Sequence, residues 1–327
     1  MDWLTSNKPP KQINKYWILD YSFYIYNGTY AMVRKCKCYI EATKKGDESC
    51  IVCGGKGKVY LANKDGFVTG GLYAVFEQII QRAAEGYKII LAFDPPKGDL
   101  YRTQLLESYK GNRGEKPEYI IKQMQMGELI FPHIPKILCY TSDIHESDDV
   151  MASKALQLAN AGHKVVVSSD DKDMLPLLDH KNVCIYRQKG FFTKELFIAK
   201  FGFEPRRFNE YLALCGDSAD NFNLFKGLGD KAVTKIIQTH DHISHVYHDH
   251  HWKKLPDKYK KLLGDYDDKG NLIGHRTEDM DLSLKISSLA DTIECIRITR
   301  EADAAFVKSK LEELEMHRAA NAIKILF

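Results

Sequence analysis

The stretch PKILCYTSDIHESDDVMASKALQLANAGHKVVVSSD, residues 135–170, decides the fold because its hydrophobic pattern changes twice. A short apolar run at 135–142 is followed by a longer run with helical spacing at 148–162, and a second short apolar run follows at 163–170. Strand, helix and strand in this order predict two parallel strands joined by a crossover helix. The stretch therefore predicts one unit of an α/β sheet.

Three carboxylates, Glu146, Asp148 and Asp149, stand within four positions where the predicted helix begins. Like charges this close repel one another, and each raises the pKa of its neighbours. Such a cluster is either a solvated first turn that suits the helix dipole or a metal site in which a cation offsets the repulsion. The octapeptide HESDDVMA alone leaves both interpretations open.

The same alternation of strands and helices extends through the first two thirds of the chain. Further strands are predicted at 16–20, 87–94 and 182–188, and helices at 70–86 and 173–179. Alternation of this kind predicts an open, mostly parallel sheet with helices on both faces, which is the α/β class. After residue 190 the pattern becomes helical, and from about residue 241 it predicts only helices and loops without clear boundaries.

The composition fits a protein with a large hydrophobic core. Of its 327 residues 44% are hydrophobic, which is enough for one large domain or two smaller ones. The net charge of +3 favours no class of partner, so any electrostatic signal has to come from local clusters. No apolar run reaches the ~18 residues of a membrane-spanning helix, and the polar start MDWLTSNKPPKQ lacks the apolar centre of a signal peptide. We expect no membrane partner and a cytoplasmic protein, in which the eight cysteines stay reduced and serve metal binding or burial.

Carboxylates follow the ends of four predicted strands. They are Asp20, Asp94, the cluster Glu146, Asp148 and Asp149, and the pair Asp171 and Asp173. Because the carboxyl ends of parallel strands lie at the same edge of a sheet, we expect these acids to meet in one crevice. They cannot all remain ionised there without cations, and oxygen ligands favour Mg²⁺ or Mn²⁺ over zinc. Two such ions about 4 Å apart are the machinery of phosphodiester hydrolysis.

Short motifs occur in a fixed order along the chain. They are ILD ending at Asp20, FD ending at Asp94, YKGNR at 109–113, ESDD at 146–149, DKD at 171–173, GDSADN at 216–221 and FKGLGDKAVTKII at 225–237. Each motif is weak by itself, but all of them in this order resemble the 5′→3′ exonuclease and flap endonuclease family, especially its phage and bacterial members. The resemblance implies a PIN-like nuclease core with a mostly parallel sheet, a helical arch over the site and a helix–hairpin–helix module.

The resemblance also implies roles for single residues. One ion is expected at Asp20, Asp94, Glu146 and Asp148, and a second at Asp149, Asp171, Asp173, Asp217 and Asp220, in part through water. Asp170, where the family has an uncharged residue, is expected to be a solvated neighbour. Lys110 and Arg113 of YKGNR are expected to reach the scissile phosphate, and Tyr109 to stack on a base. The spacing of the segment alone favours a charged surface loop.

The segment GLGDKA places Gly227 and Gly229 just before a predicted helix. A turn of this composition is often only a connection between helices. By the resemblance, Gly227, Gly229 and Lys231 hold a phosphate of duplex DNA at the helix N-terminus, with a K⁺ ion beside it.

An insertion at 34–64 interrupts the family motifs. It carries Cys36, Cys38, Cys50 and Cys53, spaced as C-x-C, eleven residues and C-x-x-C-G-G. Two close pairs of cysteines are typical of a tetrahedral Cys₄ zinc site, and a metal would have to hold a segment with so little apolar core together. Its eight Lys and Arg residues against three Asp and Glu favour contact with the DNA backbone beside the cleavage site. A structural or protein-docking knob is the alternative.

Together these features predict a nuclease core at 1–190 that contains the zinc knob at 34–64 and the arch at 97–133. The remainder, 191–327, is expected to be a helix–hairpin–helix DNA-binding region with a helical tail. The predicted activity is two-metal hydrolysis of DNA by a structure-specific 5′ nuclease that acts on 5′ flaps, 5′ ends or branched duplexes, with RNA–DNA hybrids included if it removes primers. We expect a monomer in the cytosol of a bacterium or of a phage-infected host. A metal-dependent phosphatase and a non-catalytic DNA-binding or scaffold protein of the same fold are the alternatives.

Overall fold

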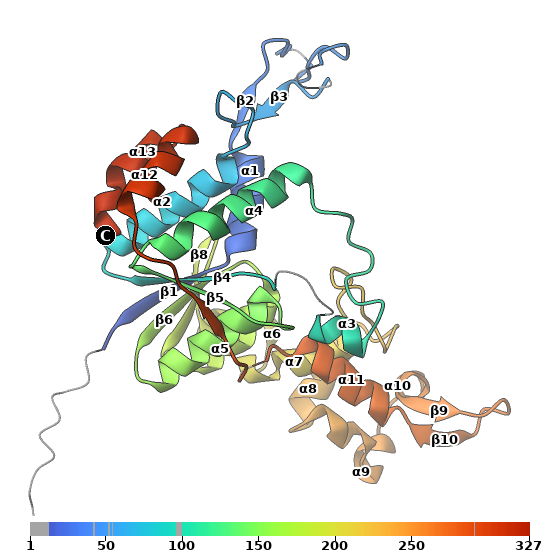
Figure 1. The fold of residues 1–327 in the computed structure, drawn as a ribbon. Helices are drawn as coiled ribbons and strands as arrows, with labels where there is room; N and C mark the ends of the chain where they lie inside the picture. Colours follow the sequence, from blue (N-terminus) through green and yellow to red (C-terminus); the bar gives the residue numbers. More distant parts are fainter. Residues whose placement is uncertain (1–12, 42, 52, 54, 96–99, 291) are drawn as a thin grey trace, which may run out of the picture.

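A mixed seven-stranded sheet lies at the centre of the molecule, with helices packed on both of its faces (Figure 1). The computed structural model describes residues 13–41, 43–51, 53, 55–95, 100–290 and 292–327. The strands are ordered β11–β5–β4–β1–β6–β7–β8. The inner strands run parallel to one another, and each edge strand is antiparallel to its neighbour. The predicted α/β class and the mostly parallel sheet are therefore confirmed.

The inner strands coincide with the apolar runs of the sequence. They are β1 (Lys15–Leu19), β4 (Lys88–Ala92), β5 (Ile137–Thr141), β6 (Lys164–Ser168) and β7 (Val183–Arg187). Because helices cover both faces of the sheet, side chains that point either way from a central strand are buried. In β1, for example, Trp17 and Leu19 enter one hydrophobic core, and Ile18 enters the other.

Two short antiparallel strands close the sheet. They are β8 (Gly190–Phe192) beside β7 and β11 (Ile296–Ile298) beside β5. The sequence pattern predicted neither of them, because three residues are too few to show an alternation. The last part of the chain therefore returns to the sheet from which the first part is built.

One layer of helices covers the face of the sheet that is uppermost in Figure 1. It contains α1 (Tyr21–Ala31), α2 (Gly70–Ala84), α4 (Glu118–Ile130), η1 (Phe131–His133), α12 (Ala304–Glu313), α13 (His317–Ala322) and η5 (Ile323–Ile325). The buried side chain of Gln123 joins its three central helices. Its Oε1 accepts hydrogen bonds from the backbone N–H groups of Gly71 and Leu72 at 2.8 and 3.3 Å, and its Nε2 donates to Thr29 Oγ1 at 2.9 Å. Gln123 thus caps the N-terminus of α2, which lacks a side-chain cap of its own.

The opposite face carries a second layer and, beyond it, a smaller helical body. The layer contains α5 (Ser147–Asn160), η2 (Lys172–Asp179), α6 (Lys194–Phe201), η3 (Pro205–Arg207) and α7 (Phe208–Cys215). The body contains α8 (Asp230–Thr239), η4 (Ile243–Tyr247), α9 (Asp249–Trp252), α10 (Asp257–Leu263), the hairpin β9 (Gly264–Tyr266) and β10 (Leu272–His275), and α11 (Thr277–Ser287). Both pack into the same hydrophobic core below the sheet.

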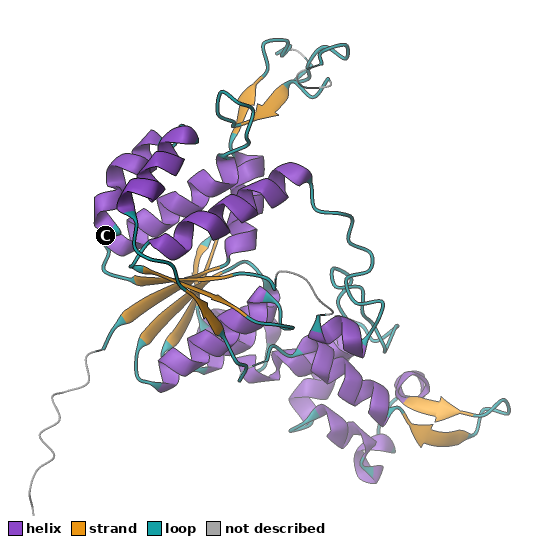
Figure 2. Cartoon of the chain, in the orientation of Figure 1, coloured by secondary structure: helices purple, strands orange, loops and turns teal. Residues whose placement is uncertain are grey.

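Two segments project from this framework. The predicted arch begins with α3 (Tyr101–Leu105) and continues as an irregular loop up to α4, as Figure 2 shows; its first residues, 97–99, lie outside the described residues. The predicted knob rises on the hairpin of β2 (Val33–Lys35) and β3 (Lys58–Tyr60) at the C-terminal end of α1. In the part of the chain that the structure describes, no helix has the length and apolar character needed to cross a membrane.

Candidate metal centre

Two of the acids sit directly at the ends of adjacent central strands. Asp20 follows β1, and its Oδ1 and Oδ2 accept hydrogen bonds from the backbone N–H of Phe23 at 3.0 Å and from Ser169 Oγ at 2.6 Å. Asp94 follows β4, and its Oδ1 accepts hydrogen bonds from the backbone N–H and the hydroxyl of Ser147 at 3.1 and 2.8 Å. These contacts fix both carboxylates at the carboxyl edge of the sheet, where the sequence placed them.

A cavity of about 690 Å³ opens at this edge. Its acidic lining consists of Asp20, Asp94, Glu146, Asp148, Asp170 and Asp171, and its basic lining of Lys110, Arg113 and Lys116. The structure therefore brings together all four residues expected at the first ion, and adds Asp171. Asp170 turns its Oδ1 toward the end of β7, where it accepts a hydrogen bond from the backbone N–H of Gln188 at 2.9 Å.

A second acidic group lies next to this cavity. One carboxylate oxygen each of Asp173, Asp217 and Asp220 lies within 4.8 Å of the others. Oδ1 of Asp173 is buried and has no hydrogen-bond partner. An unpartnered buried carboxylate oxygen beside two further carboxylates is an unfavourable arrangement unless a cation binds there. The donor set consists of oxygen atoms only, so it fits a hard divalent cation.

The pKa values of these acids reflect the same repulsion between buried carboxylates. Burial, followed by repulsion from Asp171 and Asp94, raises the pKa of Asp20 from 3.8 to about 6. Burial and neighbouring carboxylates also hold the pKa values of Asp148 and Asp173 well above the usual range. For Asp94 burial also acts to raise the pKa, but Lys116 and Ser147 together outweigh it and lower the pKa. The site as a whole therefore requires compensating positive charge to hold its carboxylates ionised at neutral pH.

Asp149 belongs to neither acidic group, although it is adjacent in sequence to Asp148 and shares Arg102 with Glu146. Its side chain is completely buried, and both of its oxygens accept hydrogen bonds from Arg102 at 2.7 Å. Arg102, which is 4% exposed, also donates to Glu146 at 3.1 Å and to backbone carbonyls near the end of α11. This bidentate buried pair joins α3, α5 and the segment after α11. Sequence reasoning missed Arg102, because nothing in its charged surroundings indicates that it is buried.

The YKGNR segment forms the foot of the arch and turns its side chains into the acidic site. Lys110 Nζ lies 2.5 Å from Glu146 Oε1, and Arg113 Nη2 lies 2.5 Å from Asp220 Oδ1. Tyr109 is only 4% exposed, and its hydroxyl lies 3.1 Å from Glu146 Oε2 and 3.0 Å from Asp220 Oδ2. Each cation thus pairs with one of the two acidic groups, and the hydroxyl of Tyr109 bridges them. The ring of Tyr109 is packed against Phe222 rather than free to stack on a base.

The backbone of this foot is docked onto the loop that carries Asp217 and Asp220. The N–H of Lys110 donates to the carbonyl of Asp220 at 2.8 Å, and the side chain of Asn221 donates to the carbonyl of Ser108 at 2.7 Å. Lys110 and Asn221 both adopt left-handed backbone conformations, with φ of 55° and 56°. Left-handed non-glycine residues are uncommon and cluster where a function depends on them. The arch and the second acidic group are therefore one connected unit.

The glycine turn lies at the start of α8, away from the acids. Gly227 has a φ of 109°, and Gly229 is the N-cap of α8 without a side-chain hydrogen bond to it. Both glycines line a cavity of about 500 Å³ together with Lys231, Lys258 and one acid, Asp230. A helix N-terminus with free N–H groups and two lysines is an anion-binding environment.

The four cysteines of the insertion lie together at the tip of the knob. The sulfur atoms of Cys36, Cys38, Cys50 and Cys53 all lie within 4.8 Å of one another. Cys36 Sγ is 3.8 Å from Cys50 Sγ, and Cys38 Sγ is 3.3 Å from Cys53 Sγ. Four sulfurs around a tetrahedral zinc ion with Zn–S bonds of about 2.3 Å are about 3.8 Å apart, so the cluster fits such an ion. The backbone N–H of Gly57 also donates to Cys53 Sγ at 3.2 Å.

Comparison with known sequences gives a consistent result. Residues 55–202 match the family described as 5′-3′ exonuclease, N-terminal resolvase-like domain. A 5′-3′ exonuclease of Buchnera aphidicola is 30% identical over 234 residues, which are 70% of this chain and 72% of that protein. A 5′-3′ exonuclease of Aquifex aeolicus is 28% identical over 82% of this chain and 89% of its own length. The flap endonuclease Xni of Yersinia pseudotuberculosis is 29% identical over 57% of this chain and 74% of its own length.

Solved structures share the fold at lower sequence identity. The T5 D15 protein co-crystallised with metal ions superposes with a TM-score of 0.59 at 15% identity, covering 96% of this chain and all of that one. Flap endonuclease-1 from Methanococcus jannaschii gives a TM-score of 0.53 at 13% identity, covering 96% of this chain and 91% of that one. At such identities these likenesses establish the architecture, including the seven-stranded sheet and its helical layers.

Proposed function

The chain belongs to the family of 5′-3′ exonucleases and flap endonucleases, and from this premise we propose how its residues act on DNA. The protein is a 5′ nuclease of this family, and two adjacent acidic groups carry its chemistry. The observation that supports this assignment is that both groups meet the cations of the arch at one edge of the sheet. Bound divalent ions would activate the attacking water and stabilise the leaving oxygen of the phosphodiester.

The first ion is assigned to Asp20, Asp94, Glu146 and Asp148, and the second to Asp173, Asp217 and Asp220, with Asp171 between them. The raised pKa values of Asp148 and Asp173 support this division, because each group is influenced by Asp171 as well as by its own neighbours. Mg²⁺ or Mn²⁺ suits these oxygen ligands. Asp149 is assigned an indirect role: it orients Glu146 through their shared partner Arg102.

Lys110 and Arg113 are assigned to the scissile phosphate. Their present partners are carboxylates that we assign to the ions, so ion binding would release both cations toward the substrate. A cation beside the phosphoryl oxygens neutralises the charge that develops there. Tyr109 is proposed to contact the base next to this phosphate once the foot of the arch has opened, since its hydroxyl is held by the same two carboxylates.

Duplex DNA is assigned to the start of α8. We infer a helix–hairpin–helix module from α7, α8 and the glycine turn between them, with Gly227, Gly229 and Lys231 at a backbone phosphate. The free N–H groups of α8 and the positive φ of Gly227 support this assignment. A K⁺ ion would share the carbonyl groups of the same turn. The module belongs to the region 191–327. The nuclease core is assigned to 1–190, and the last segment of the chain, from β11 to η5, packs onto it.

Structural zinc is assigned to the four cysteines of the knob at 34–64. The sulfur geometry supports it, and so does the near absence of buried apolar side chains in this insertion other than Cys36 and Cys53 in its described part. The substrate class that follows is DNA with a 5′ end, a 5′ flap or a branch, RNA–DNA hybrids included, bound by a monomer.

A metal-dependence experiment tests the central assignment. Release of a 5′-labelled product from a flap substrate is expected with Mg²⁺ and not with EDTA. Asp173→Asn is expected to lower the single-turnover rate by at least ~100-fold, because it removes the unpartnered oxygen of the second group. Asp179→Asn at the other end of η2 is the matched control and should cleave at the wild-type rate. Wild-type cleavage by Asp173→Asn, or cleavage in EDTA, would contradict the two-ion assignment.

A further inference from the structure

A series of tyrosine rings leads out of the acidic cavity along α1. Tyr26 lines the cavity, and Tyr30, one turn later on the same helix, is 47% exposed. Their rings are stacked, with centroids 6.4 Å apart and an interplanar angle of 29°. Tyr26 is partly buried and packs against the upper core, whereas Tyr30 is exposed. The series therefore begins at the edge of the core and reaches the surface at Tyr30.

Two further tyrosines continue this series at the base of the knob. The ring of Tyr60, on β3, lies 5.7 Å from that of Tyr30 and 5.0 Å from that of Tyr119, which is on the first turn of α4. The hydroxyl of Tyr119 lies 3.2 Å from the hydroxyl of Tyr30 and 3.4 Å from that of Tyr60. These contacts tie α1, the knob and the upper end of the arch together around rings that are only partly buried.

Lysines extend the series up the stem of the knob. In the hairpin Tyr60 is paired with Val33, and Lys58 is paired with Lys35. Residues two apart on a strand share a face, so both lysines rise on the same face as Tyr60. Like charges directly opposite each other destabilise a hairpin. Lys35 Nζ forms an ion pair with Glu41 Oε1 at 2.5 Å, which offsets part of this repulsion. Lys58 has no carboxylate partner among the residues that the structure describes.

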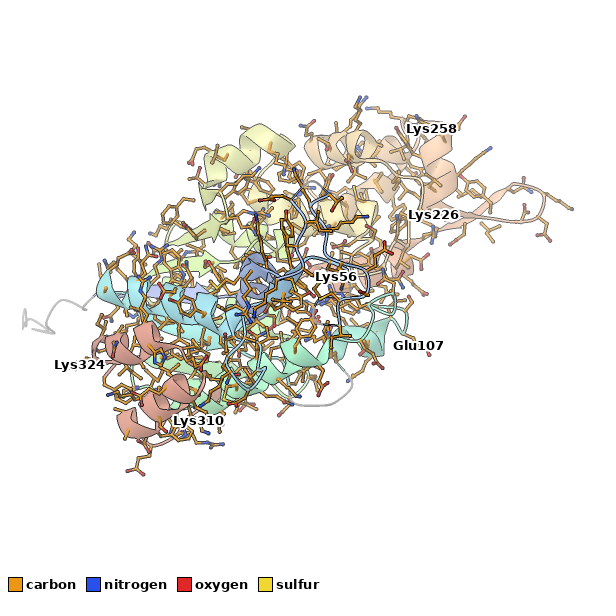
Figure 3. All side chains as sticks on the ribbon, turned by 90° about the horizontal axis from the view of Figure 1, so that it is seen from above. Lys56, Glu107, Lys226, Lys258, Lys310 and Lys324 are labelled. Carbon is orange, nitrogen blue, oxygen red and sulfur yellow. The ribbon has the colours of Figure 1, made fainter. Side chains whose placement is uncertain are left out.

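The knob as a whole is a positively charged surface with few internal partners. Its eight Lys and Arg side chains are all exposed, and within the described part of the insertion Lys35 alone pairs with a carboxylate. Figure 3, viewed from above, shows Lys56 of the knob near the middle of the molecule, with Lys310 and Lys324 at its lower left margin. In the described part of the insertion, the positive charge of the knob is therefore offset by a carboxylate only at Lys35.

We propose that Tyr26, Tyr30, Tyr60 and Tyr119, together with Lys35 and Lys58, form a track that binds single-stranded nucleic acid between the metal cavity and the knob. Exposed aromatic rings bind unstacked bases of any sequence, and lysines beside them hold the phosphates. A duplex offers no free base faces to such rings. This inference rests on the proposed nuclease function, because a 5′ nuclease acts on a strand whose single-stranded end leaves the cavity.

The test compares substrates with and without a single-stranded 5′ tail. Tyr30→Ala, which lies outside the insertion, should weaken binding of a tailed substrate and of oligo-dT about tenfold, the effect of one lost stacked base. Tyr30→Phe keeps the ring and should bind like the wild type. Lys35→Ala/Lys58→Ala should make the salt dependence of log K for oligo-dT shallower by about 1.4, the value for two contacts to a single strand. Lys310→Ala/Lys324→Ala is the matched control and should leave this slope unchanged.

Cleavage of a tailless duplex with a recessed 5′ end separates this inference from the proposed function. Tyr30→Ala, Tyr30→Phe and Lys35→Ala/Lys58→Ala should cleave this duplex at the wild-type rate. If the wild-type protein itself failed to cleave it, that result would contradict the nuclease assignment and not the track. Unchanged affinity of Tyr30→Ala for tailed substrates would overturn the track. An equal loss for tailed and tailless substrates would also overturn it, since it would indicate a contact with the duplex. Zinc content and melting temperature show whether the lysine variants are folded.

Discussion

Asp148 and Asp149 are neighbours in sequence with opposite environments. Asp148 faces the acidic cavity, where burial and nearby carboxylates raise its pKa. Asp149 faces the other way and is neutralised by Arg102 through two hydrogen bonds of 2.7 Å. A step of one residue along the helix therefore changes the environment completely. Asp148 has no hydrogen-bonded cation among the described residues, whereas Asp149 is paired with Arg102. The sequence could place both at the start of the helix but could not assign their partners, because Arg102 lies in a segment without hydrophobic pattern.

This contrast makes the two positions a matched pair for mutagenesis. Asp149→Asn should lower the free energy of unfolding by roughly 3 kcal/mol, because it leaves the buried charge of Arg102 with Glu146 as its only carboxylate partner. Asp148→Asn should leave the stability of the metal-free protein unchanged or raise it, since it removes a charge that burial disfavours. Urea denaturation in EDTA measures both effects.

The cleavage rates should show the opposite order. Asp148→Asn is expected to abolish cleavage of a flap substrate, while folded Asp149→Asn should keep part of its activity. Asp149→Asn could instead be as stable as the wild type and as inactive as Asp148→Asn. That result would show that Asp149 is an ion ligand rather than a partner of Arg102.

At the scale of elements, the foot of the arch and the loop at 216–221 act as one unit. The backbone N–H of Lys110 donates to the carbonyl of Asp220, and the side chain of Asn221 donates to the carbonyl of Ser108. The motifs YKGNR and GDSADN could each be found in the sequence, and the resemblance to the family implied that they share a site. Their direct contact could not be predicted, because it depends on left-handed backbone conformations at two residues that are not glycine.

Lys110→Ala and Arg113→Ala test the role of this unit. Each should reduce the single-turnover cleavage rate by about 100-fold, since one lost charge-stabilising contact in a transition state costs on the order of 3 kcal/mol. Affinity for duplex DNA should change little, because the duplex is assigned to α8. Lys122→Ala on the exposed face of α4 is the control. Unchanged single-turnover rates would reduce YKGNR to a charged loop.

The knob is an element whose stability should depend on metal. Elemental analysis is expected to find one zinc ion per chain, and Cys50→Ser/Cys53→Ser should lose it, because two of the four sulfurs are removed. Cys184→Ser, at an exposed cysteine outside the knob, should keep the zinc. Proteolysis within 34–64 should become faster in the double variant only. A metal-free wild-type protein with an equally resistant knob would contradict the zinc assignment.

At the scale of the whole molecule, the sequence predicted the parallel sheet but not how the chain finishes it. The inner strands are apolar runs that stand out in any window, and all of them were found. The strand β11 and the helices α12 and α13 were not, since they come from a weakly patterned tail in which only tertiary contacts decide the structure. Val307 and Leu311 of this tail are nevertheless fully buried in the core above the sheet. The final residues are therefore part of the nuclease core in space.

The acidic site should set the pH dependence of the stability of the whole molecule when divalent ions are removed. The pKa of Asp20 is about 6 in the folded protein against 3.8 as its ordinary value. Between these values the folded state keeps a proton that the unfolded chain has released, so the free energy of unfolding falls as the pH rises. The raised pKa values of Asp148 and Asp173 act in the same direction.

Thermal unfolding in EDTA should therefore give a lower melting temperature at pH 7 than at pH 5. Mg²⁺ should raise the melting temperature more at pH 7, because ions compete with protons for the same oxygens. Asp148→Asn should reduce the difference in melting temperature between pH 5 and pH 7 in EDTA. A melting temperature in EDTA that rises steadily from pH 4 to pH 7 would contradict these pKa shifts.

The closure of the sheet by β8 and β11 has a consequence for how the protein behaves in a crowded solution. A parallel sheet that ended at β5 or β7 would present a five-residue row of free N–H and C=O groups to any passing chain. Each of those rows is covered instead by a strand of only three residues that runs in the opposite direction. Short edge strands are poor templates for intermolecular pairing. Both edges of the central sheet are thus protected against pairing with other chains, so we expect the protein to remain dispersed at high concentration.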